Sequence, residues 1–149
     1  MEFLVRPKAD KFSYEASLEE LHRGSRFWLT ELEFWKDELS FLTHLTDRYF
    51  EEFVRKEQLG QAAEFFKKLR TLREERLGGL VDKVNKHESH LAVLLENPFE
   101  PDDTAFRVEH QELETQVTEF MKDYKAVKKE AFTVIEEIRK DEKPRQLPG

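Results

Sequence analysis

Residues 28–42 read WLTELEFWKDELSFL, and large apolar residues return within this stretch at alternating steps of four and three positions. The residues on this repeat are Trp28, Leu32, Trp35, Leu39 and Leu42. In an α-helix such spacing places the apolar side chains on one seam, which coiled coils and helical bundles bury against neighbouring helices. The stretch therefore predicts a long amphipathic helix that packs in a bundle.

The repeat extends in both directions from this stretch and recurs in two later segments. The first stripe consists of Leu18, Leu21, Ser25, Trp28, Leu32, Trp35, Leu39, Leu42, Thr46, Tyr49 and Phe53. The second stripe, which is less regular, consists of Phe65, Leu69, Leu72, Leu80, Val84, His87, Leu91 and Leu94. The third consists of Phe106, His110, Leu113, Val117, Phe120, Tyr124, Val127, Ala131, Val134 and Ile138. Long stripes with short connections predict an all-α fold: an up-down-up bundle of three long, antiparallel, coiled-coil-like helices.

Local signals predict the ends of the first helix. Ser17 followed by Glu20 is a capping-box pattern, so the helix should begin there. It is predicted to run to about Gln58, with Gly60 as the break in a short turn. The second helix is then predicted to cover roughly residues 61–96.

Prolines mark the second turn. Pro98 should end the second helix, because the residue before a proline is disfavoured in the helical region. Asp102 or Asp103 is the predicted N-cap of the third helix, which should run to about Lys140. The predicted domain organisation is an extended N-terminal arm (residues 1–16), a three-helix bundle (17–140) and a frayed C-terminal tail (141–149).

Two consecutive glycines, Gly78 and Gly79, fall inside the second predicted helix, where the stripe changes register. Counting residues from the two turns gives the height of each residue along the bundle. This level count places Phe41 and Leu42 of the first helix at the height of the two glycines. The favoured interpretation is that the glycines make room for these bulky side chains. The alternative is a kink, since each interior glycine costs about 1 kcal/mol relative to alanine.

The composition suits one helical domain. The chain has 149 residues, enough for a continuous core, and charged and hydrophobic residues each make up 38%. There are no cysteines, which excludes disulfides and thiolate metal sites. No apolar run approaches the ~20 residues that span a bilayer, and the N-terminus lacks the pattern of a secretory signal. We therefore expect a cytoplasmic protein without a membrane partner.

Charge and motifs exclude several classes of function. The net charge of −7 disfavours nucleic acid as a partner, because phosphate binding needs clustered Lys and Arg. The sequence has no Gly-rich phosphate loop, no nucleophile-elbow pattern and no serine with a recognisable base partner. Its acidic residues follow polar helix faces. We therefore predict no enzyme activity, no catalytic residues and no cofactor.

Four histidines are the candidate metal ligands. The level count places His90 opposite His110 near one end of the bundle, with His87 one turn from His90 and His22 at the same end. Imidazoles with nearby glutamates can bind Zn²⁺ or iron in helical bundles. The spacing of His87 and His90 is one residue short of the His-Glu-x-x-His zinc pattern. The favoured interpretation is a hydrogen-bonded polar layer; a pH-sensitive layer and a metal site are the alternatives.

Phe27, Phe34 and Phe41 recur every seven residues, about 100° around the helix from the main seam, with Leu45 beside them. We call these three phenylalanines the aromatic row. A single three-helix bundle does not need this second stripe, and exposed apolar rows usually mark an association surface. The row therefore predicts a protein interface, most simply in a homo-oligomer. The alternatives are that the N-terminal arm covers it or that it widens the core.

Three segments resemble an uncharacterised family of small bacterial helical-bundle proteins. They are Glu31-Leu-Glu-Phe-Trp-Lys-Asp-Glu-Leu, Asn85-Lys-His-Glu-Ser-His-Leu and Gln111-Glu-Leu-Glu-Thr with the heptads that follow it. The resemblance covers most of residues 17–140. It implies a helical bundle, and it carries over no activity and no functional residues. The sequence thus predicts a non-enzymatic interaction or structural module, with a histidine metal site as the alternative.

Overall fold

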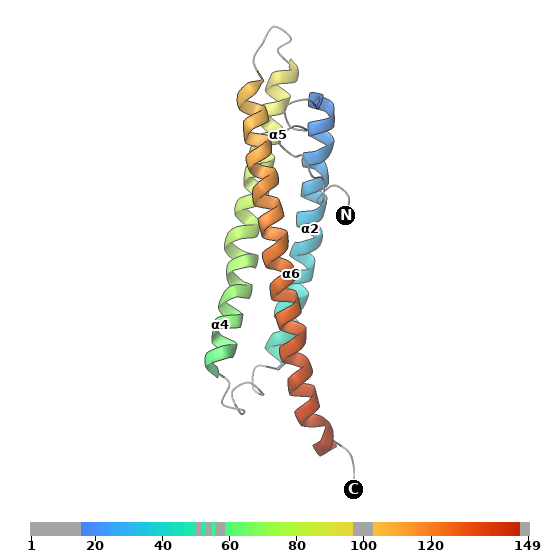
Figure 1. Ribbon diagram of the computed structural model, residues 1–149, viewed down its shortest axis with the longest axis vertical. Helices are drawn as coiled ribbons and strands as arrows, with labels where there is room; N and C mark the ends of the chain where they lie inside the picture. The colour runs from blue at the N-terminus through green and yellow to red at the C-terminus, as the bar shows by residue number, and fades with distance from the viewer. Residues whose placement is uncertain (1–15, 50–51, 53–54, 56–58, 97–102, 147–149) are drawn as a thin grey trace.

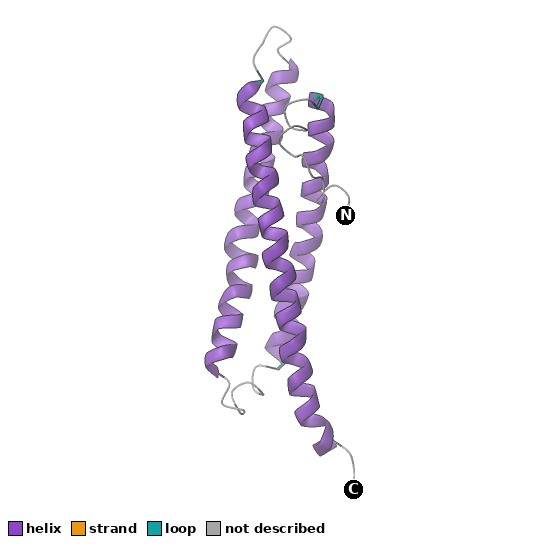
Figure 2. Cartoon of the chain, in the orientation of Figure 1, coloured by secondary structure: helices purple, strands orange, loops and turns teal. Residues whose placement is uncertain are grey.

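The computed structural model describes residues 16–49, 52, 55, 59–96 and 103–146. Its helices are α2 (Leu18–Arg48), α4 (Leu59–Arg70), the π-helix η2 (Thr71–Arg76), α5 (Leu77–Glu96) and α6 (Thr104–Gln146). Since α4, η2 and α5 follow one another without a gap, they form one rod. Figure 2 shows helix along almost all of the described chain and no strand within it. The prediction of an all-α bundle with long helices is confirmed.

The three rods lie side by side, and each contacts the other two (Figure 1). In this view α2 descends, the α4–η2–α5 rod ascends and α6 descends again. The start of α2, the end of α5 and the start of α6 therefore share one end of the bundle, which we call the histidine end. An ion pair between His22 and Glu88 joins α2 to α5 there, at 2.7 Å between Nδ1 and Oε2.

The start of α2 follows the capping-box prediction. The Ser17 hydroxyl accepts from the Glu20 backbone N–H at 3.1 Å, and the Ser17 N–H donates to the Glu20 carboxylate at 3.2 Å. These bonds satisfy backbone donors that a helix start leaves open. Local sequence alone is sufficient to fix this boundary.

The end of α2 differs from the prediction. The helix stops at Arg48, not near Gln58, and Gly60 lies inside α4, not in a turn. The Tyr49 N–H donates to the carbonyls of Thr46 and Asp47, which tightens the last turn and closes the helix. The apolar repeat continues through Tyr49, so periodicity did not reveal this end.

The core follows the predicted seams with one drift. In α2 the buried residues are Leu21, Ser25, Trp28, Leu32, Trp35, Leu39, Leu42 and Thr46, all on the predicted stripe. In α6 the seam holds as far as Ala131, and the next buried residue is Ile135, whereas Val134 is only partly buried. A straight α-helix drifts by about 20° per heptad, so a long seam must take an extra four-residue step.

The register shift in the second rod comes from the π-helix. The Leu77 N–H bonds to the Leu72 carbonyl, five residues back, and both side chains are buried. A π-helix widens one turn and accommodates an extra residue. The five-residue step from Leu72 to Leu77 therefore still returns the seam to the core.

The glycine pair does not pack against the aromatics, so that prediction is wrong. Gly78 and Gly79 are exposed, and a Cβ on either would have no atom within 4 Å. Phe41, expected to face them, is itself exposed. The level count did not include the direction of each side chain around the helix, and the π-helix η2 changes that direction in the second rod.

Because neither glycine has a packing role, we expect Gly78→Ala and Gly79→Ala each to raise the free energy of unfolding by up to about 1 kcal/mol. Urea unfolding followed by circular dichroism measures the change. The reverse substitution at the exposed Ala92 of α5 should lower stability by a similar amount. A loss of stability in either alanine variant would mean that the glycines serve a packing or flexing role.

The predicted ends of the chain are only partly described. The predicted arm of residues 1–16 lies outside the described residues except for Ala16, which is buried beside Leu21 and Phe106. The predicted tail from residue 141 is helical as far as Gln146, although Pro144 lies within this stretch. Within the part that the structure describes, no helix is long and apolar enough to cross a membrane.

Candidate functional site

His87 lies fully buried at the histidine end of the bundle. It occupies a seam position of α5, three residues after Val84 and four before Leu91, so the helix directs it into the core. Its ring stacks flat on Phe106 of α6, with centroids 4.1 Å apart and an interplanar angle of 4°. Two elements thus fix the plane of this imidazole.

His110 of α6 faces His87 across the bundle. It is 1% exposed, and its Nδ1 lies 3.0 Å from Nε2 of His87. On its other side the ring meets Trp28 of α2, with centroids 4.5 Å apart. The sequence placed His90 opposite His110; the structure places His87 there, because His87 lies on the seam and His90 lies at its edge.

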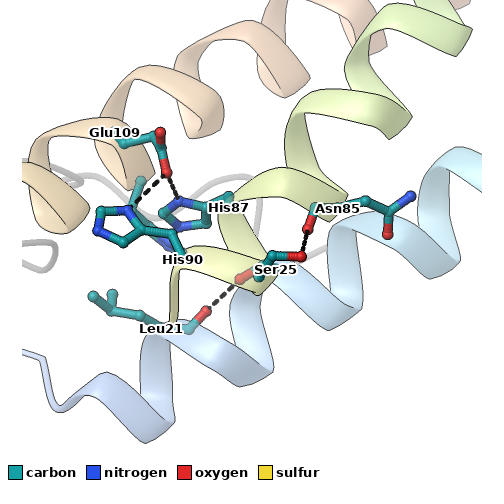
Figure 3. Close-up of polar contacts among 8 residues, drawn as sticks. Leu21, Ser25, Asn85, His87, His90 and Glu109 are labelled. Carbon is teal, nitrogen blue, oxygen red and sulfur yellow. Dashed lines mark hydrogen bonds and ion pairs between the residues drawn. The ribbon is translucent and has the colours of Figure 1, made fainter. Parts of the chain in front are cut away.

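Glu109 closes the outer edge of this pair. One carboxylate oxygen lies 2.5 Å from Nδ1 of His87 and 3.6 Å from Nδ1 of His90 (Figure 3). The carboxylate is 44% exposed, so it connects the buried ring to the solvent. We call His87, His110 and Glu109 the histidine layer.

The hydrogen bonds assign the protons of the layer. A carboxylate accepts, so Nδ1 of His87 carries the hydrogen that Glu109 receives. A neutral His87 then has a lone pair on Nε2, and the Nδ1–H of His110 donates to it. The carboxylate thereby determines the tautomers of both rings, as outer partners of histidines commonly do.

Burial lowers the pKa of His87 below its ordinary value, because desolvation penalises the charged ring. The hydrogen bond and the charge of Glu109 act in the opposite direction and raise the pKa, but burial outweighs them. The ring is therefore neutral near neutral pH. A neutral His87 hydrogen-bonded to His110 agrees with the predicted polar layer.

The four histidines do not gather at one point. His22 lies against Glu88, apart from the layer, and His90 contacts Glu109 of the layer at 3.6 Å. Over residues 16–49, 52, 55, 59–96 and 103–146, no group of three or more His, Asp or Glu has the geometry to hold a metal ion. Metal binding by these side chains stays a prediction, and elemental analysis of untagged protein tests it.

The aromatic row lies on an exposed flank of α2, beside the buried seam. Phe27, Phe34 and Phe41 are 37%, 54% and 58% exposed, whereas Leu45 is half-buried. The row therefore does not widen the core. Residues 1–15, which the sequence offered as a cover, lie outside the described residues.

A groove beside the π-helix was not found from the sequence. It has a volume of about 420 Å³ and runs between η2 and α6, over Leu72 and Val127. An ion pair between Arg76 and Asp123 lies along it, and the Arg76 guanidinium covers the Phe120 ring at 5.5 Å. The five-residue step after Leu72 is the sequence signal that could have located it.

Comparisons with models of known protein families, with curated proteins and with solved structures found no match for this chain. The resemblance of three segments to small bacterial helical proteins therefore stays a hypothesis from the sequence. Function has to be argued from the residues themselves.

Proposed function

We propose that this chain is a non-enzymatic helical interaction module that self-associates through the aromatic row of α2. The observation that carries the proposal is the exposure of Phe27, Phe34 and Phe41 on one helix face. Their seven-residue spacing repeats the side-chain pattern of a helix–helix interface. Single exposed apolar residues are ordinary, but an aligned row of three aromatic rings is not.

The size of the row indicates the strength of association. With about 200 Å² per phenylalanine, the exposed fractions amount to about 300 Å² of apolar surface on each copy. Burying this area on two copies would contribute about 15 kcal/mol at ~25 cal/mol per Å². Association itself costs about 4–15 kcal/mol. The difference lies between about 0 and 11 kcal/mol, and the roughly 8 kcal/mol of a micromolar dimer falls within this range.

The spacing of the row favours a second copy as the partner. In an antiparallel pair of α2 helices centred on Phe34, each Phe27 would lie opposite the partner's Phe41. Such a two-fold arrangement uses the same patch on both copies and closes without exposing a further surface. It needs no other protein to supply a complementary row.

Acidic side chains beside the row oppose this pairing at low ionic strength. Glu31, Asp37 and Glu38 lie on either side of Phe34, and burial raises the pKa of Glu31. Glu38 is bound by Lys128 at 2.9 Å, whereas Glu31 and Asp37 would meet their like-charged counterparts across the two-fold axis. Salt screens such repulsion, so added salt should strengthen the dimer.

The test is the Phe34→Glu, Phe41→Glu double variant. We expect its mass in light scattering or sedimentation to stay at the 17.9 kDa of one chain, whereas the unaltered protein approaches twice this mass at micromolar concentration. Raising salt from about 20 mM to about 0.5 M should tighten the wild-type dimer. Because both positions are exposed, helical circular dichroism should not change.

Phe132 provides the matched control. It is an exposed phenylalanine of α6, so Phe132→Glu makes the same chemical change away from the row. This variant should keep the wild-type mass. The proposal fails if the wild-type protein is a monomer at high micromolar concentration, or if Phe132→Glu and the double variant dissociate equally. A monomeric wild type would direct attention to a different protein as the partner.

A further inference from the structure

The groove between η2 and α6, which we call the η2 groove, has the size and the lining of a small-molecule site. Its volume of about 420 Å³ lies within the range of about 300–1,000 Å³ that is usual for such sites. Buried Leu72 and Val127 and the exposed Ala126 give it an apolar floor. We propose that the η2 groove binds a medium-chain carboxylate, with the hydrocarbon chain on this floor and the carboxylate at the lysines of α4.

Two ion pairs cross the groove and set its length. Lys68 of α4 pairs with Glu130 of α6 at 3.7 Å between Nζ and Oε2. Arg76 of η2 pairs with Asp123 of α6 at 2.5 Å between Nη1 and Oδ2. Asp123 and Glu130 are seven residues apart on α6, so the two pairs are separated by about 10 Å along the helix, a length that an extended chain of about eight to ten carbons spans.

The π-helix forms the middle and one end of the groove. Its first residues, Thr71 and Leu72, and its last, Arg76, all line the groove, which therefore follows the widened turn. Single π-turns inside α-helices are frequent at functional sites. The Arg76 guanidinium lies over the Phe120 ring at 5.5 Å and is bound by Asp123, so both interactions hold its charge at this end.

The charges favour an anionic group at the opposite end, next to α4. Both carboxylates that line the groove are bound by cations, Asp123 by Arg76 and Glu130 by Lys68. Lys67 also lines the groove, and within the part of the chain that the structure describes it forms no ion pair. Its ammonium group gives this end an excess of positive charge, although the whole chain carries a net charge of −7.

The two parts of the ligand have different roles in binding. An exposed ion pair contributes little free energy, so the carboxylate at Lys67 mainly orients the ligand. The affinity comes from the apolar surface that the hydrocarbon chain covers on Leu72, Ala126 and Val127. This site is separate from the aromatic row, which lies on α2, and the proposal does not depend on self-association.

Backbone amide chemical shifts, measured while decanoate is added, test the proposal. The amides of Thr71, Leu72, Ala126 and Val127 should shift along one saturation curve, with one molecule per chain and a dissociation constant of about 1 mM or tighter. Decyltrimethylammonium has the same hydrocarbon chain and the opposite charge. It should bind at least about ten-fold more weakly, although the net charge of −7 favours a cation over an anion.

Two substitutions, each with a matched control, locate the site. Ala126→Phe places a ring on the floor and should prevent binding at decanoate concentrations that saturate the unaltered protein, whereas Ala92→Phe on α5 should not. Lys67→Glu should weaken binding by about three- to ten-fold, and Lys86→Glu on α5 should have little effect. All of these positions are exposed, so helical circular dichroism should not change.

Three results would overturn the proposal. They are shifts along the aromatic row with none in the η2 groove, binding of decyltrimethylammonium as tight as that of decanoate, and unchanged decanoate binding by Ala126→Phe. The shift map and the comparison of the two probes use the unaltered protein, so they decide the question even if a variant does not fold.

Discussion

Replacing Phe106 by alanine should lower the free energy of unfolding by about 3–5 kcal/mol, the range for a fully buried aromatic side chain. For a chain of this length the melting temperature should fall by about 10 °C or more. Urea unfolding at pH 7.5 measures the free energy, and a thermal melt measures the temperature.

The position of Phe106 explains why the expected loss of stability is large. The ring is fully buried; one face stacks on His87 at 4.1 Å, and its centroid lies 5.5 Å from that of His90. Alanine would remove these contacts and leave the buried His87 ring beside a cavity. The cavity adds to the loss of apolar burial, because the surrounding helices can close it only in part.

Phe132→Ala is the matched comparison. This phenylalanine belongs to the same helix but is 46% exposed, so its truncation should cost less than about 1 kcal/mol. A Phe106→Ala variant as stable as Phe132→Ala would contradict the packing described for the histidine end. A large loss in both would indicate that Phe132 is buried in solution, for instance against a second copy.

Parts of this fold could be predicted from local sequence because they depend on local interactions. The Ser17 capping box and the seam of α2 involve residues within one or two turns, so spacing alone determines them. The exposure of the aromatic row follows from the same argument, since Phe34 lies about 100° from the seam. Helical period fixes which face a side chain occupies.

The histidine pairing could be predicted only in part. Counting levels from the turns placed His90 opposite His110, with His87 one turn from His90. Which ring meets His110 depends on the angle around α5, and that angle is set by the extra residue in η2. The role of Glu109 could not be assigned, because one carboxylate bridges rings on another helix at 2.5 and 3.6 Å. Such contacts depend on how the rods dock.

The π-helix therefore controls the angular position of α5, and a deletion tests this control. Removing Glu75 changes the five-residue step between Leu72 and Leu77 to a four-residue step. An ordinary α-helix then carries both leucines on one seam, and Arg76 stays next to Leu77. We expect the shortened protein to fold with wild-type helical content and with stability within about 1 kcal/mol, the usual range for a surface change.

The same deletion in α6 should have the opposite result. Glu119 is also exposed, but it lies in a regular α-helical turn without an extra residue. Its removal therefore rotates all the following residues of α6 by about 100° around the helix axis. Phe120, Tyr124 and Val127 would leave the core, so the cooperative unfolding transition should be lost or shifted by several kcal/mol. Equal damage from the two deletions in urea unfolding would mean that η2 is required for the fold. If only the Glu75 deletion is tolerated, the widened turn serves to accommodate one extra residue. The seam then requires the correct angle around the helix between Leu72 and Leu77, and not a particular side chain at position 75.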